Sequence, residues 1–145
     1  MSGLWRNFLT LCWAVWRRDR QILTKGCDCW FWVSPLDVGI RTLKSDRYFQ
    51  MAEAAQLDFG VRSGLLQSLR HNSCVMVNAE QHIQFSQPIH VLNRVRVLTR
   101  ISAKDDRFIH FEHVFYRGEQ LCATVHVKAK FKRGRLTIAP AQLTP

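Results

Sequence analysis

Residues 45–60 read SDRYFQMAEAAQLDFG, a stretch in which apolar and small residues recur at intervals of three and four positions. That interval is the spacing of one face of an α-helix. The residues on this face are Tyr48, Met51, Ala52, Ala55 and Phe59. Serine often caps the N-terminus of a helix and glycine often ends one, so we expect one long helix from Ser45 to Gly60. A short helical turn over residues 65–69 is expected after Gly64.

The residues after this helix alternate between apolar and polar types, which predicts long antiparallel strands. These strands cover residues 75–85, 91–101, 108–116 and 121–132, and residues 135–139 can add a short edge. In the first of them the alternation assigns one face to Val75, Val77, Ala79, Ile83 and Phe85, and the other face to Asn78, Glu80, His82 and Gln84.

The residues before the helix supply one more strand and a loop. Residues 28–33 are aromatic and β-prone, whereas residues 36–44 show no sustained periodicity. The order of strand, loop, one main helix and then four strands predicts an α+β fold, in which a curved antiparallel sheet of about five strands wraps one central helix. We expect a single domain over residues 26–139, followed by a tail over residues 140–145. Dimerisation would cover the free face of the sheet.

A separate N-terminal segment, residues 1–25, is marked by composition, because all five tryptophans lie within the first 32 residues. Its apolar residues are Trp5, Phe8, Leu9, Cys12, Trp13 and Trp16, which predict an extra amphipathic helix. The apolar part is shorter than the roughly 20 residues that cross a bilayer. Arginines follow it directly in place of a cleavage site, which disfavours a signal peptide. The stripe fits a helix packed on its own domain, and it also fits peripheral membrane contact through residues 1–20.

The chain has 145 residues and a formal net charge of +10, so its surface should attract an anionic partner. Alternation places Arg94, Arg96 and Arg100 on one face of their strand, and Lys128, Lys130 and Lys132 on one face of another. Aromatic residues are not interleaved with these cations, which disfavours nucleic acid as the partner. An odd number of irregularly spaced cysteines indicates reduced thiols in a cytoplasmic protein, and no metal site is expected.

Three groups of residues resemble motifs of one family. Asp37 precedes the helix, Arg47-Tyr48-Phe49 opens it, and Glu53-Ala54-Ala55 follows. A later hairpin reads Gly118-Glu119-Gln120-Leu121-Cys122-Ala123. In order and spacing, residues 28–133 resemble the hotdog-fold thioesterases of the 4-hydroxybenzoyl-CoA thioesterase type. The resemblance implies a hotdog fold, an acyl-CoA or acyl-carrier-protein thioester as substrate, and a homodimer or tetramer that binds it between subunits.

The same resemblance implies the roles of individual residues. Asp37 is the candidate catalytic carboxylate, and Glu53 is a second one. Backbone N–H groups around Lys44 and Ser45 would polarise the thioester carbonyl. The expected substrate-binding residues are Tyr48, Arg94, Arg96, Lys128 and Lys130. No cofactor is expected, because CoA enters as part of the substrate. Relatives carry His and Asn before the helix, whereas residues 41–44 contain neither. A non-catalytic hotdog module that binds acyl thioesters, a protein or a membrane is therefore the alternative.

Overall fold

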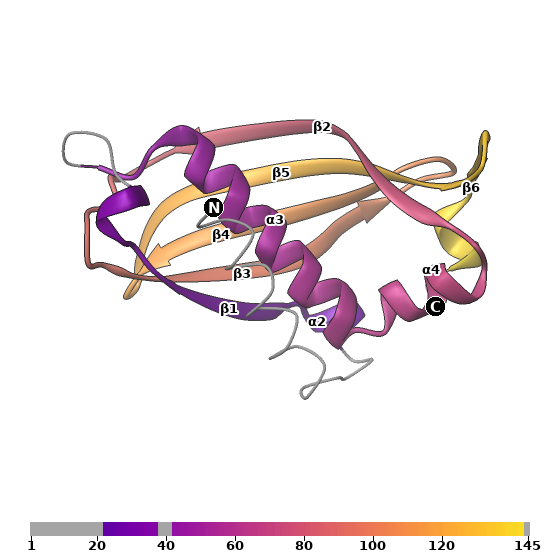
Figure 1. Ribbon diagram of the computed structural model, residues 1–145, viewed down its shortest axis with the longest axis horizontal. Coiled ribbons are helices and arrows are strands. Elements are labelled where there is room, and N and C mark those ends of the chain that lie inside the picture. The colour runs from indigo at the N-terminus through magenta and orange to yellow at the C-terminus, as the bar shows by residue number, and fades with distance from the viewer. Residues whose placement is uncertain (1–21, 38–41, 144–145) are drawn as a thin grey trace.

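A curved antiparallel sheet wraps one long helix in the computed structural model, which describes residues 22–37 and 42–143 (Figure 1). The sheet strands are β1 (Cys27–Trp32), β2 (Val75–Phe85), β3 (Arg94–Lys104), β4 (Ile109–Arg117), β5 (Gln120–Arg133) and β6 (Leu136–Ile138). Their order is β1-β3-β4-β5-β2, and β6 pairs with β5. The helices are α2 (Ile22–Lys25), α3 (Ser45–Arg62) and α4 (Leu65–His71), with short 3₁₀ turns η1 (Pro35–Asp37) and η2 (Pro140–Gln142). The α+β hotdog architecture predicted from the sequence is confirmed.

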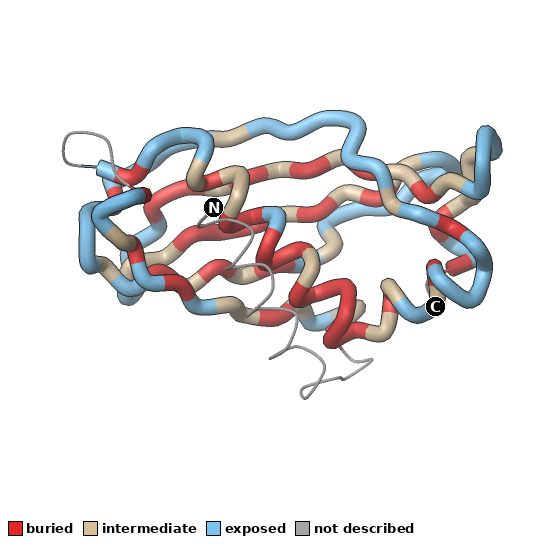
Figure 2. The backbone as a smooth tube through the Cα atoms, viewed as in Figure 1, coloured by how far each residue is buried: buried red, intermediate tan, exposed pale blue. Residues whose placement is uncertain are grey.

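The core lies between α3 and the inner face of the sheet (Figure 2). Alternate residues of the central strands point at the helix and are almost fully buried, as alternation predicted for β5. The aromatic rings interlock: Phe59 of α3 packs edge-on against Phe111 of β4, with ring centroids 5.7 Å apart. Full burial of such a side chain contributes roughly 1.5–3 kcal/mol, so this contact fixes the helix on the sheet.

Both ends of α3 differ from the sequence expectation. Lys44 occupies the N-cap position, because Arg47 N and Tyr48 N both donate to Lys44 O, and Ser45 is the first helical residue. The helix also continues through Gly60 to Arg62. Gly60 is needed there because α4 packs against it: a Cβ at this position would lie 2.9 Å from Leu66 Cγ.

A bulge in β2 reverses the face on which its side chains lie. The register against β5 shifts between Asn78 and Glu80, so Ala79 is an extra residue. Before the bulge, Asn78 faces α3 and Val77 lies on the outer face opposite Lys130; after it, Glu80 faces outward. The prediction that Val75 and Val77 share a face with Ile83 and Phe85 is therefore wrong, because alternation cannot reveal an inserted residue.

Residues 140–143 pack against the domain, although residues 140–145 were expected as a tail. Pro140 and Leu143 are buried, and Ser68 Oγ of α4 donates to Leu143 O at 3.1 Å. The amphipathic helix expected within residues 1–25 falls mostly outside the described residues. None of the described helices combines the length and the apolar character that crossing a bilayer requires.

Candidate active site

The N-terminus of α3 opens onto a pocket of about 350 Å³. Its lining residues are Thr42, Leu43, Ser45, Tyr48, Phe85, Ser86, Gln87 and Pro88. The N-cap residue Lys44 makes no side-chain capping hydrogen bond to the backbone N–H groups of the first turn. These donors and the positive end of the helix dipole favour an electron-rich oxygen at this position.

Tyr48 forms the apolar wall of this N-terminal pocket. Its ring lies 5.2 Å from that of Phe85 in an edge-on arrangement and 5.3 Å from that of Phe115. Burial raises the pKa of Tyr48 to about 12. The phenol is therefore protonated at neutral pH, and its ring supports apolar contact.

Asp37 is fully buried beside the start of α3. Its Oδ2 accepts hydrogen bonds from the backbone N–H and the hydroxyl of Ser34, both at 3.0 Å, and its Oδ1 lies 3.9 Å from Arg47 Nε. Lys44 N also donates to Asp37 O at 3.0 Å. The Asp37 side chain thus bonds back to Ser34 across η1, and the Asp37 backbone joins this turn to the N-terminus of α3. The structure brings Asp37, Lys44 and Ser45 to one end of the helix.

Glu53 is exposed on α3 and lines a second pocket of about 210 Å³ between α3 and β2. This pocket is also lined by Gln56, Leu57, Leu66, Met76 and Asn78. Glu53 lies eight residues after Ser45, which is about 12 Å along the helix axis. Glu53 therefore lines a different pocket from the one at the N-terminus of α3, and the buried Asp37 carboxylate lines neither of them.

The basic residues lie on the outer face of the sheet, away from α3. Arg96 is opposite Tyr116 and Lys128 is opposite His110, so they are about 20 Å apart along β4. Arg96 forms an ion pair with Asp28 at 3.1 Å, and Lys128 Nζ lies 4.2 Å from the centre of the Phe108 ring. Within one chain, the structure does not join Arg94 and Arg96 to Lys128 and Lys130, nor any of them to Asp37 or Glu53.

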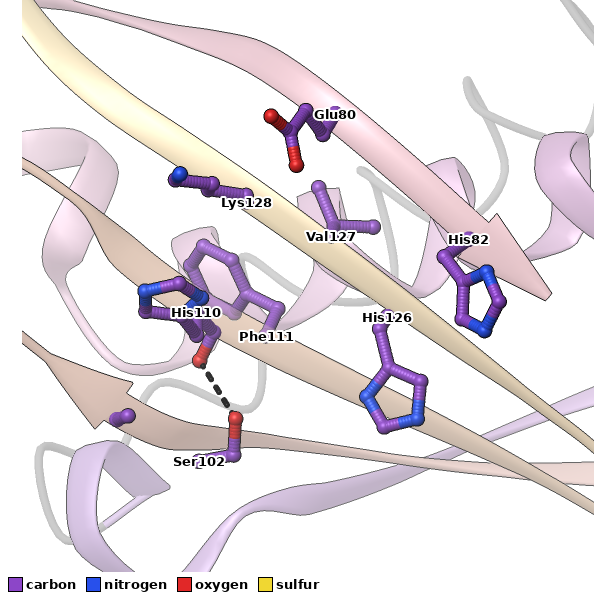
Figure 3. A pocket seen from close by; sticks show the side chains of 9 residues that line it. Glu80, His82, Ser102, His110, Phe111, His126, Val127 and Lys128 are labelled. Carbon is purple, nitrogen blue, oxygen red and sulfur yellow. Dashed lines mark hydrogen bonds between the residues drawn. The ribbon is translucent and has the colours of Figure 1, made fainter. Parts of the chain in front are cut away.

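A hollow of about 370 Å³ on the outer face gathers polar residues from four strands (Figure 3). They include Glu80, His82, Ser102, His110, His126 and Lys128. The rings of His82 and His126 stack with centroids 6.0 Å apart, and Ser102 Oγ donates to His110 O. Within the described part of the chain, no group of three or more His, Cys, Asp or Glu residues is arranged to hold a metal ion.

A buried polar chain behind the second pocket escaped the sequence reasoning. His113 Nδ1 lies 2.8 Å from Thr99 Oγ1, and His113 Nε2 lies 3.3 Å from Gln56 Oε1. Gln56 Nε2 then donates to Asn78 Oδ1 at 3.0 Å. One signal was present in the sequence: alternation assigns His113 to the opposite face from His110, and that face is the core.

Comparisons with known proteins agree with the fold. Residues 33–137 match the model of the thioesterase-like superfamily. A probable thioesterase from Bartonella henselae is similar in structure, with a TM-score of 0.69 and 20% identity, covering 79% of this chain and 98% of that one. The gentisyl-coenzyme A thioesterase BH1999 has a TM-score of 0.68 and 19% identity, covering 80% and 95%. Protein SAV2348 from Staphylococcus aureus, solved in complex with CoA, has a TM-score of 0.71 and 15% identity, covering 81% and 77%.

None of the curated proteins compared with the chain is similar enough to count as a match. The long helix wrapped by a curved antiparallel sheet defines a hotdog fold. The chain belongs to the thioesterase-like superfamily.

Proposed function

We propose that this protein hydrolyses acyl thioesters of CoA or of an acyl carrier protein. The observation that carries the proposal is the N-terminus of α3, which lacks a side-chain cap and opens onto a pocket lined by Ser45, Tyr48 and Phe85. In a member of the thioesterase-like superfamily, this arrangement offers hydrogen-bond donors for a carbonyl oxygen beside an apolar wall for an acyl group.

The reaction needs little more than this pocket and a carboxylate. Water adds to the thioester carbon, negative charge develops on the carbonyl oxygen, and the thiolate then leaves. The N–H groups of Ser45 and Asp46 would stabilise that oxyanion, since the Lys44 N–H already donates to Asp37 O. Asp37 is tied to this helix end, because its backbone O accepts from Lys44 N and its carboxylate Oδ1 lies 3.9 Å from Arg47 Nε. We therefore assign this carboxylate the role of base or nucleophile. Glu53 is the second candidate, because it faces the neighbouring pocket.

A second copy of the chain would complete both pockets. Among the described strands, β2 pairs only with β5, and its other edge is free over 11 residues. Such an edge is a template for strand pairing. Pairing of two β2 edges would give a homodimer, and packing of two dimers would give a tetramer. Pairing through β2 would leave Arg94, Arg96, Lys128 and Lys130 on the outer face of the shared sheet, so any contact of these residues with the CoA phosphates would depend on how two dimers pack.

The test offers short, medium, long and aromatic acyl-CoAs to the full chain and measures the release of free thiol. Asp37→Asn should lower kcat at least about 100-fold if Asp37 acts on the substrate. Ser34→Ala is the matched control, since it removes one hydrogen bond to the same carboxylate and leaves the carboxylate in place. Asp46→Asn controls for loss of an exposed charge in the first turn of α3.

Glu53→Gln is assayed in parallel and separates the two carboxylates. A large loss in Glu53→Gln with near-normal rates in Asp37→Asn would move the chemistry to the second pocket. Wild-type rates in both variants would contradict carboxylate catalysis at either position.

One observation favours the alternative of a module that binds acyl thioesters without cleaving them. The Asp37 carboxylate is fully buried and already accepts two hydrogen bonds from Ser34, and residues 41–44 contain no His or Asn. Calorimetry with a non-hydrolysable acyl-CoA analogue distinguishes the two functions. Tight binding without thiol release from any substrate would establish the binding module.

A further inference from the structure

One end of the molecule presents large apolar side chains to solvent. Trp32, the last residue of β1, is 66% exposed, and Leu36 of η1 is 70% exposed. The turn that leads into β3 adds Val91, which is 38% exposed, and Leu92, which is 70% exposed. We call these four residues the apolar tip. It lies at the end of the molecule where β1 leaves the sheet, opposite β6 (Figure 1).

Backbone hydrogen bonds hold the segments of the apolar tip side by side. Leu92 N donates to Val33 O at 2.7 Å, and Val33 N donates to Asn93 O at 3.0 Å. Trp32 lies opposite Arg94 in the register of β1 and β3. The exposed apolar side chains therefore come from adjoining pieces of backbone that are fixed to the sheet.

Leu92 adopts an unfavourable backbone conformation. Its φ of 69° is in the left-handed region, which residues with a Cβ avoid and which Gly or Asn would occupy at lower cost. The turn is fastened by Asn93, whose Oδ1 accepts from His90 N at 2.8 Å and whose N donates to His90 O at 3.2 Å. An exposed leucine in a strained turn is a poor choice for stability, which indicates that its side chain has another use.

Aromatic and cationic side chains border the apolar tip on the outer face of the sheet. Trp30 is 48% exposed, and the Arg94 guanidinium lies 4.2 Å from the centre of its ring. The Arg96 guanidinium lies 4.4 Å from the centre of the Tyr116 ring. At a bilayer surface, aliphatic side chains insert deepest, Trp and Tyr lie at the level of the headgroups, and Arg contacts anionic headgroups. The side chains at this end of the molecule follow the same order. The chain's net charge of +10 has the complementary sign.

We propose that the apolar tip docks on the surface of a membrane that contains anionic lipids. Leu36, Val91 and Leu92 would enter the boundary between headgroups and acyl chains, Trp30 and Trp32 would lie among the headgroups, and Arg94 would contact lipid phosphates. The backbone of the turn stays at headgroup depth, where water can satisfy its polar groups. The proposal does not depend on hydrolysis by the pockets, nor on the membrane contact predicted for residues 1–20.

The test measures cosedimentation of the full chain with vesicles of phosphatidylcholine alone and with one fifth phosphatidylserine. Leu92→Asn removes the apolar side chain and suits the left-handed conformation, so the fold should be retained. Leu136→Asn is the matched control, because Leu136 is 66% exposed on β6 at the opposite end. We expect Leu92→Asn to lower partitioning onto anionic vesicles at least about fivefold and Leu136→Asn to leave it unchanged.

Arg94→Gln should reduce the preference for anionic over neutral vesicles. Equal partitioning of wild type and Leu92→Asn would overturn the proposal. A change in the oligomeric mass of Leu92→Asn without vesicles, measured by sedimentation, would also overturn it, because the apolar tip would then be a contact between copies of the chain. Thermal melts show whether each variant is folded. If Leu92→Asn does not fold, the same measurement is made with Leu36→Ser.

Discussion

His113 is completely buried, and both of its ring nitrogens are engaged. The Gln56 amide donates from Nε2 to Asn78 Oδ1, so its Oε1 accepts a hydrogen bond from His113 Nε2–H. His113 Nδ1 is then unprotonated and accepts a hydrogen bond from the Thr99 hydroxyl. Burial, with a smaller effect from His126, lowers the pKa of His113 to about 3. The ring is therefore neutral at physiological pH, and it fixes the Gln56 amide that lines the second pocket.

This histidine makes stability depend on pH. Below its ordinary pKa of 6.5 the unfolded chain takes up a proton on His113, whereas the folded chain does so only near pH 3. Stability is therefore lost as the pH falls through that window, by about 1.4 kcal/mol per pH unit. Urea unfolding at pH 6.5 and pH 5 should show a loss of about 2 kcal/mol that His113→Gln lacks. Parallel pH profiles of the two proteins would contradict this.

The buried ion pair at the end of α3 predicts a second residue-scale effect. Arg62 Nη1 donates to Asp58 Oδ2 and to Asp28 O, both at 3.0 Å, and so ties the helix to β1. Burial raises the pKa of the Cys27 thiol to about 12, and this protonated thiol donates to the same Asp58 oxygen at 3.7 Å. Asp58→Asn would leave Arg62 buried without its charge partner, at a cost of about 3 kcal/mol in the free energy of unfolding.

Chemical denaturation checks this value, and the surface supplies a control. The Arg100–Glu112 pair spans β3 and β4 at the same 3.0 Å, but the Arg100 side chain is half exposed. Glu112→Gln should therefore cost less than about 1 kcal/mol. If the two variants lose similar free energies of unfolding, then burial does not make the Asp58–Arg62 pair more important for stability than an exposed pair.

At the scale of elements, Gly60 sets the distance between α3 and α4. Alanine favours a helix over glycine by about 1 kcal/mol, yet its Cβ would lie 2.9 Å from Leu66 Cγ. We expect Gly60→Ala to destabilise by about 1 kcal/mol net, because overpacking costs roughly 1–3 kcal/mol.

A double-mutant cycle isolates this contact. In the background of Leu66→Ala the space is free, and Gly60→Ala should then stabilise the protein through helix propensity. A Gly60→Ala effect of the same sign and size in both backgrounds, measured by urea unfolding, would show that the close approach to Leu66 is unimportant.

Elements with regular periodicity were predictable, and interrupted ones were not. The inward residues of β5 and the apolar face of α3 follow directly from alternation and from helical spacing. Gly60 was expected to break α3, because the sequence does not show that α4 returns to pack there. The position of Asp37 before the helix was predictable from the sequence, but the hydrogen bonds between Asp37 and Ser34 were not. The separation of Arg96 from Lys128 was not predictable either, because it depends on the register of β3 and β5 against β4.

At the scale of the whole molecule, the free edge of β2 predicts the assembly. Val75 is 62% exposed and Val77 is 39% exposed on this edge strand. We expect a dimer by light scattering, and we expect Val75→Lys combined with Val77→Lys to shift it toward monomer, because edge lysines oppose strand pairing. Leu136→Lys, on β6, should leave the mass unchanged. A monomeric wild type at micromolar concentration would contradict pairing through β2.

The bulge at Ala79 gives β2 an uneven tolerance to changes in its length. Asn78 and Phe85 both face α3 although they are seven positions apart, because the extra residue restores their common side. Deletion of one residue near Ala79 would remove the bulge and leave regular pairing with β5 on both sides of it. Insertion of one residue elsewhere in β2 would move the side chains of half of the strand to the opposite face of the sheet. Length variants of this strand should therefore survive as deletions and fail as insertions.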